Sequence, residues 1–265
     1  MKIIKAILFT ILYTAIYIGL QFIVLLVMIF AIGIDFAFEN LTLSIVLSSI
    51  LAFPVYWSFV NLRKQTLSTA CNFRKFDIRQ IPLFILLGFF LQYLVQGIMI
   101  IFKLEEKFPE HARTMQLLFE GGSPIIIILA IVISGPFIEE ILFRGLIFNE
   151  LKNIMPHALA VIIQALIFGL IHGNLLQMSY AFAFGIIIGF IVIWSHSIWP
   201  AVITHISING TPFLTSLFWE SNQINQFISN NKIPVITTCG IIVIVIVYFI
   251  YRLNHTVSRT TEGSC

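Results

Sequence analysis

Long apolar stretches separated by short polar loops follow one another along the whole chain. An α-helix needs about 20 apolar residues to cross the hydrocarbon core of a membrane. The pattern predicts eight such helices, of which the fifth is short, near Ala6–Ile34, Leu43–Leu62, Ile81–Phe102, Ser123–Phe148, Ala158–Asn174, Leu176–Trp194, Ile198–Trp219 and Ile233–Tyr251. We therefore expect an all-α, polytopic membrane helix bundle that forms a single domain over residues 1–265.

The composition supports this class. Hydrophobic residues make up 59% of the chain and charged residues 10%, and the mean hydropathy is +1.00. Soluble domains do not reach these values. The net charge of +3 comes without a basic stripe or an aromatic-interleaved basic patch, so nucleic acid is excluded as a partner.

The charges of the loops predict an orientation. The loop after the second apolar stretch carries five basic residues against Asp77 alone, namely Arg63, Lys64, Arg74, Lys75 and Arg79. Lys2 and Lys5 precede the first stretch, whereas the loop after it holds Asp35 and Glu39 and no base. Cytoplasmic loops carry the excess of Lys and Arg. We therefore expect an integral, multi-pass protein of a cell membrane with both termini in the cytoplasm.

Ionisable residues interrupt the fourth apolar stretch. Glu139, Glu140 and Arg144 lie within it, and each such group costs roughly 2.5 to 3.5 kcal/mol at the bilayer centre, so it marks a functional site by default. Glu140 and Arg144 are four residues apart and share a helix face, whereas Glu139 points about 100° away. Upstream, Pro136 cannot donate a backbone hydrogen bond, which frees the carbonyl of Val132. These residues alone leave a buried structural network and a hydrated site equally open.

Two more polar pairs occur in apolar stretches. Phe168 and His172 are four residues apart, and so are His205 and Asn209. A lone histidine in a membrane helix is usually a hydrogen-bonding contact between helices. A glutamate with one or two histidines can activate water, either as a general base or as a metal-ligand set. Histidine with asparagine supplies donors for an oxyanion, provided that the three helices meet.

These motifs, in this order, resemble those of the CPBP family, the CAAX-protease and bacteriocin-processing intramembrane proteases that are also called the Abi family. The series is Glu139-Glu140-x-x-x-Arg144, Phe168-x-x-x-His172 and His205-x-x-x-Asn209, with Ser197-Ile-Trp-Pro-Ala201 shortly before His205. The resemblance covers about a third of the chain, and we take residues 124–209 as the family-like catalytic core.

The resemblance implies an intramembrane endopeptidase that hydrolyses a peptide bond in a membrane-anchored or lipidated substrate. By motif position, Glu139 would activate water with the help of His172, while His205 and Asn209 would stabilise the oxyanion. Glu140 would pair with Arg144, and Phe168 would pack the site.

The cofactor stays open at this stage. Family members are commonly called metalloproteases, so Glu139, His172 and His205 are the candidate zinc ligands if a metal is present. The chain lacks the His-Glu-x-x-His arrangement in which one helix builds a zinc site, so a metal-free mechanism is slightly favoured.

Two other functions stay open as well. Some relatives resemble bacteriocin self-immunity factors, in which catalysis is not always required. A non-catalytic scaffold or transporter would need only the Glu140–Arg144 pair. The additional presence of Glu139, His172, His205 and Asn209 therefore disfavours this function. A bacterial membrane is the expected location, and membrane lipid and a membrane-anchored peptide or protein are the expected partners.

Overall fold

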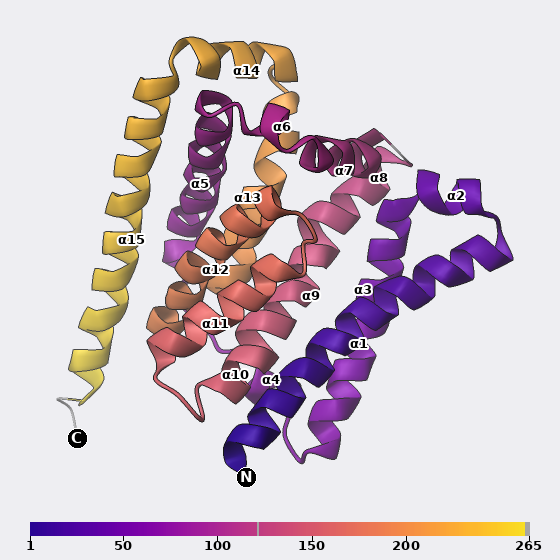
Figure 1. Ribbon diagram of the computed structural model, residues 1–265. Coiled ribbons are helices and arrows are strands. Elements are labelled where there is room, and N and C mark those ends of the chain that lie inside the picture. Colours follow the sequence, from indigo (N-terminus) through magenta and orange to yellow (C-terminus); the bar gives the residue numbers. More distant parts are fainter. Residues whose placement is uncertain (121, 263–265) are drawn as a thin grey trace.

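The computed structural model describes residues 1–120 and 122–262, and within these ranges all regular structure is helical (Figure 1). The all-α fold is therefore confirmed. The elements, in chain order, are α1 (Lys2–Ala31), α2 (Ile34–Glu39), α3 (Leu41–Leu62), α4 (Leu67–Ala70), η1 (Ile78–Gln80), α5 (Ile81–Ile101), α6 (Leu104–Lys107), α7 (Pro109–Glu120), α8 (Pro124–Ile127), η2 (Ile128–Ser134), α9 (Gly135–Glu140), η3 (Ile141–Ile147), α10 (Phe148–Leu151), α11 (His157–Leu170), α12 (Leu175–Ser195), α13 (Trp199–Ser216), α14 (Ser221–Asn230) and α15 (Lys232–Glu262).

Each of the eight predicted stretches is helical, but in the described ranges only six helices are long and apolar enough to cross a membrane. These are α1, α3, α5, the continuous helix Pro124–Leu151, α12 and α15. The fifth stretch forms only the 14 residues of α11, about 21 Å at 1.5 Å per residue, which is shorter than a bilayer core of about 30 Å. Polar side chains lower the hydropathy of the 18-residue α13. The count of eight crossings therefore stays a prediction.

The helices form one bundle with its short connections at the two ends. Figure 1 shows α1 and α3 on one side, α5 and α15 on the other, and α11, α12 and α13 between them. The N-terminus of α1 and the C-terminal end of α15 lie at the same end of the bundle, whereas α6 and α7 lie across the opposite end. An even number of membrane crossings would place the two ends of the chain on the same side, as in this arrangement.

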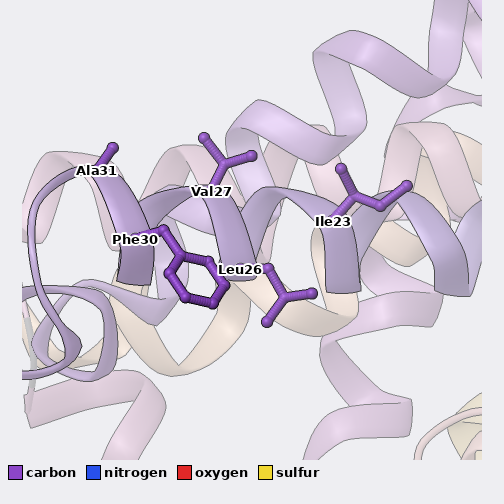
Figure 2. A pocket seen from close by; sticks show the side chains of 5 residues that line it. All are labelled: Ile23, Leu26, Val27, Phe30 and Ala31. Atoms are coloured by element: carbon purple, nitrogen blue, oxygen red, sulfur yellow. The ribbon is translucent and has the colours of Figure 1, made fainter.

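One face of α1 packs into the bundle, and the other face presents apolar side chains to the surroundings. The buried residues recur every three to seven positions, as Thr10, Tyr13, Tyr17, Val24 and Met28, which is the spacing of a helix that buries a single stripe. An open hollow of about 490 Å³ along the last turns is lined only by apolar side chains, those of Ile23, Leu26, Val27, Phe30 and Ala31 (Figure 2). It holds no catalytic or metal-ligating group, and such a surface suits lipid chains.

The polar segment that follows α5 forms the two short helices α6 and α7. His111 of α7 is only 4% exposed, and its Nε2 atom lies 3.1 Å from the hydroxyl oxygen of Tyr180 in α12. Burial lowers the pKa of the His111 imidazole, because a charged ring would lose its hydration. This buried contact holds α7 against the bundle.

Helices α5 and α13 approach closely at Gly88. A Cβ atom at this position would lie 2.6 Å from the Thr204 carbonyl oxygen and 2.8 Å from the Ile208 nitrogen, both in the backbone of α13. Small residues allow helices in membranes to pack backbone against backbone. At the same contact the Ser207 hydroxyl donates to the Ile85 carbonyl oxygen at 2.6 Å, so Gly88 sets the position of the helix that carries His205.

Gly88→Ala is therefore expected to destabilise the protein by about 1–3 kcal/mol, since α5 and α13 must separate. Gly19→Ala in α1 is the matched control, because nothing lies within 4 Å of a Cβ atom there, and alanine is the better helix former. Thermal unfolding in detergent micelles, followed by circular dichroism, measures both. Equal melting temperatures for the two variants would contradict the close approach at Gly88.

Candidate active site

The acidic pair lies between two π-helical segments of one long helix. Glu139 and Glu140 end α9, with η2 before them and η3 after them. π-Helical turns are rare and occur often at functional sites, because they shift the side chains that follow out of regular α register. All seven residues of η3 are buried, whereas η2 buries Ala130 and Val132 and exposes Ile128, Leu129 and Ile133.

Glu140 and Arg144 form a buried ion pair, as the spacing predicted. The Arg144 Nη1 atom lies 3.0 Å from Glu140 Oε1, and the two side chains are 1% and 0% exposed. The Arg144 guanidinium also lies over the ring of Phe168, 4.5 Å from its centroid. A buried charge of this kind persists only when it is paired and hydrogen-bonded.

His205 of α13 joins the two carboxylates. Its Nδ1 atom lies 2.7 Å from Glu140 Oε1, and its Nε2 atom lies 3.8 Å from Glu139 Oε2. Because the carboxylate accepts, Nδ1 is the donor, so Glu140 fixes the ring and turns Nε2 toward Glu139. Glu140 thus has two partners, Arg144 and His205, where the sequence suggested one.

His172 lies beyond the end of its helix. The sequence placed it inside a span that ends at Asn174, but α11 ends at Leu170, and His172 lies in the turn that leads to α12. Its Nδ1 atom is 2.7 Å from the Phe168 carbonyl oxygen. Since that oxygen accepts, a neutral His172 ring carries its proton on Nδ1, and Nε2 is the atom that can take a proton.

The ring of Phe168 lies between the two imidazoles. Its centroid is 4.8 Å from that of His172 and 5.8 Å from that of His205, and both contacts are edge-to-face. Phe168 is 2% exposed, so its packing fixes the separation of the histidines. In the described ranges no hydrogen bond joins His172 directly to Glu139 or to His205.

Asn209 contacts the backbone of η2. Its amide Nδ2 donates to the carbonyl oxygen of Ile131 at 2.9 Å. In a π-helix the carbonyl of Ile131 would accept from the N–H of the residue five positions later. That residue is Pro136, which has no N–H. The carbonyl freed by Pro136 is therefore that of Ile131 and not that of Val132, and Asn209 satisfies it. One N–H of the Asn209 amide remains for another acceptor.

Two polar residues at the site were missed from the sequence. The Tyr17 hydroxyl of α1 donates to Glu139 Oε1 at 2.9 Å. Gln164 of α11 is 0% exposed, and its Nε2 donates to the carbonyl oxygens of Val161 and Gly185. A hydroxyl and an amide in otherwise apolar stretches were the only signals for them, and such signals do not identify the partner.

The side chains of the site, as they lie in this structure, do not converge on one point as metal ligands do. Among residues 1–120 and 122–262, no group of three or more His, Cys, Asp or Glu side chains is arranged to hold one. The two nitrogens of His205 are directed at the two carboxylates, and Nδ1 of His172 is taken by the Phe168 carbonyl. A zinc site usually needs three or four such ligands converging on one point.

Residues 121–211 match the family model described as type II CAAX prenyl endopeptidase Rce1-like. This part of the chain is Rce1-like. The matched range contains every residue of the three motifs, so the resemblance predicted from them is confirmed. No solved structure gives a significant match to the chain.

Two bacterial relatives match over similar lengths. The chain is 29% identical over 103 residues to "Putative membrane peptidase YdiL" of Bacillus subtilis (strain 168), a match that covers 39% of this chain. It is 30% identical over 104 residues to "Membrane-embedded CAAX protease MroQ" of Staphylococcus aureus (strain USA300), over 37% of this chain. In both cases the match spans 42% of the relative. The six long apolar helices and these relatives support an integral, multi-pass membrane protein.

Arg144→Leu is expected to destabilise the protein by about 3–5 kcal/mol, because it leaves the charge of Glu140 buried without its cation. The control is Arg79→Leu, which breaks an exposed pair with Asp77 and should leave the melting temperature unchanged, because surface pairs contribute little. Chemical denaturation in mixed micelles gives the free energy difference. A stable Arg144→Leu protein would show that the pair does not hold the site together.

Proposed function

We propose that the protein is an intramembrane endopeptidase that hydrolyses a peptide bond in a membrane-anchored or lipidated substrate. The observation that carries this proposal is the approach of His205 Nε2 to within 3.8 Å of Glu139 Oε2, inside an Rce1-like segment. A carboxylate that can take a proton from water then lies opposite an imidazole that can donate to an oxyanion. The 3.8 Å gap is too long for a direct hydrogen bond and suits a bridging water.

Glu139 is the general base in this mechanism. Its carboxylate takes a proton from the attacking water while the water oxygen forms a bond to the substrate carbonyl carbon. The π electrons of that carbonyl move to its oxygen, which becomes the oxyanion. Nε2 of His172 accepts or returns the proton, because Nδ1 is held by the Phe168 carbonyl oxygen. The oxyanion electrons then re-form the carbonyl, the C–N bond breaks, and the leaving nitrogen, which takes the electron pair of that bond, receives the proton.

His205 and Asn209 are the donors to the oxyanion. His205 donates through Nε2 when both ring nitrogens carry protons, since Nδ1 serves Glu140. Asn209 donates through its second N–H, since the first is held by the Ile131 carbonyl oxygen. Both groups are fixed before the substrate arrives, and such preorganisation gives oxyanion donors their effect. Glu140 and Arg144 hold the orientation of His205.

Residues 124–209 are the proposed catalytic core of a single domain, and the flanking helices embed it in the lipid. The basic loops predict that both termini lie in the cytoplasm. Protection against a bacteriocin is the alternative use, in which cleavage would be dispensable. No contact in the described ranges favours that alternative.

Glu139→Gln is expected to lower the cleavage rate by about 10²- to 10⁴-fold, because the amide cannot take a proton from water. The assay uses purified protein in liposomes with a quenched fluorescent peptide that ends in a farnesylated CAAX sequence. The same peptide with a palmitoyl anchor is the second probe. Glu106→Gln in α6 is the control, since its exposed carboxylate pairs with Lys103 far from the motifs in the chain.

Two outcomes would count against this function. If Glu139→Gln cleaved either probe as fast as the unchanged protein, Glu139 would not be the base. The second outcome is that the unchanged protein cleaves neither probe but protects cells from a bacteriocin, and that Glu139→Gln protects them equally. Protection without cleavage would then be the function.

Cleavage is also expected to survive treatment with EDTA and 1,10-phenanthroline, because the site offers no converging set of three ligands. Metal analysis of the purified protein, beside Glu139→Ala and His172→Ala, is the direct measurement. About one zinc per chain that both variants lose would contradict the metal-free mechanism.

A further inference from the structure

One contact of the proposed general base comes from outside the Rce1-like segment. Tyr17 lies in α1, 122 positions before Glu139, whereas the family model begins at residue 121. Its side chain is buried at 6% exposure, and its hydroxyl donates to Glu139 Oε1 at 2.9 Å. A hydrogen bond to an ionised acceptor of this kind is stronger than one between neutral groups.

The two oxygens of Glu139 have different surroundings. Oε1 receives the Tyr17 hydroxyl, and Oε2 faces Nε2 of His205. A glutamate side chain has three rotatable bonds, so an unrestrained carboxylate would present either oxygen in many directions, and its ordering costs conformational entropy. With Oε1 held, the carboxylate plane is fixed and Oε2 is the oxygen left for water.

The helix that carries Tyr17 is held by contacts that do not involve Glu139. One turn earlier, the hydroxyl oxygen of Tyr13 accepts from Arg63 Nη1 at 2.8 Å, and Arg63 also pairs with Glu150 of α10. The Tyr56 hydroxyl of α3 donates to the Tyr13 carbonyl oxygen at 3.0 Å. These contacts fix α1 against α3 and α10, so Tyr17 is presented from a rigid element, as precise positioning requires.

We propose that Tyr17 is a positioning residue, whose hydroxyl orients the Glu139 carboxylate so that Oε2 takes the proton from the attacking water. This inference rests on the proposed function. Tyr17 keeps its own proton throughout the step, while the water proton moves to Oε2 and the water oxygen bonds to the substrate carbonyl carbon. Helix α1 thereby completes a site whose motifs all lie in residues 124–209.

Tyr17→Phe tests the inference against Tyr180→Phe as the control. Each variant removes one tyrosine hydroxyl that forms a hydrogen bond between helices, since the Tyr180 hydroxyl oxygen lies 3.1 Å from His111 Nε2, but of the two only Tyr17 contacts Glu139. With the farnesylated peptide in liposomes, we expect Tyr17→Phe to lower kcat by about 10- to 100-fold with KM unchanged, the scale of losing a group that orients a reacting one. Tyr180→Phe should keep kcat, while both variants lose similar thermal stability.

Infrared spectroscopy gives a readout that does not depend on cleavage. In protein labelled with ¹³C-glutamate, the difference between the unchanged protein and Glu139→Gln identifies the carboxylate band of Glu139. Tyr17→Phe should shift this band, because the carboxylate loses a donor, and Tyr180→Phe should leave it in place. A merely structural tyrosine would not produce this difference.

The outcomes separate this inference from the proposed function. An unshifted Glu139 band in Tyr17→Phe, or an equal loss of kcat in both variants, overturns the positioning role. Undiminished cleavage by Glu139→Gln overturns the proposed function itself. Loss of cleavage in Glu139→Gln with full cleavage in Tyr17→Phe would reject the inference and leave the function standing.

Discussion

The buried charge of Glu140 is the constraint on which the site depends. A carboxylate with 0% exposure in a membrane bundle must be compensated, since an unpaired charge there costs far more than the fold can supply. Arg144 supplies the cation and His205 a second donor, both on Oε1. These two contacts tie α13 to the helix of the acidic pair, and they place Nε2 of His205 opposite Glu139. The contacts that compensate the buried charge of Glu140 therefore also set the geometry of the proposed active site.

The irregular backbone of η2 also has a polar group that a side chain from another helix must satisfy. Pro136 removes a donor from the π-helical ladder of η2, and the carbonyl of Ile131 takes its hydrogen bond from Asn209. An unsatisfied carbonyl at membrane depth would cost several kcal/mol. Asn209 thus satisfies a backbone carbonyl that Pro136 leaves without a donor. Its other N–H remains for the proposed oxyanion. The hydrogen bond that satisfies this carbonyl also holds the Asn209 amide in place, as a proposed oxyanion donor requires.

Sequence reasoning succeeded where the interactions are local. Apolar runs specify helices in a membrane because no other spanning structure satisfies the backbone, and the Glu140–Arg144 pair follows from helical spacing. It failed for His172, since hydropathy continues to Asn174 although α11 ends at Leu170. It also assigned the wrong carbonyl to Pro136, because a π-helix cannot be recognised from residue spacing. Tyr17 was missed because its contact spans 122 positions, and apolar helices carry no signal of register relative to one another.

The three motifs do not include every residue that contacts Glu139, because one contact comes from α1. The Rce1-like range supplies the carboxylates, both imidazoles and Asn209, but it does not enclose them. Oε1 of Glu139 has a donor only because α1 packs beside the acidic helix, and α1 is fixed there by the contacts of Tyr13 with Arg63 and Tyr56. A base that must select one oxygen needs rigid neighbours on both sides. One side is His205 of α13, and the other is Tyr17, in a helix that hydropathy alone would describe as a lipid-facing anchor.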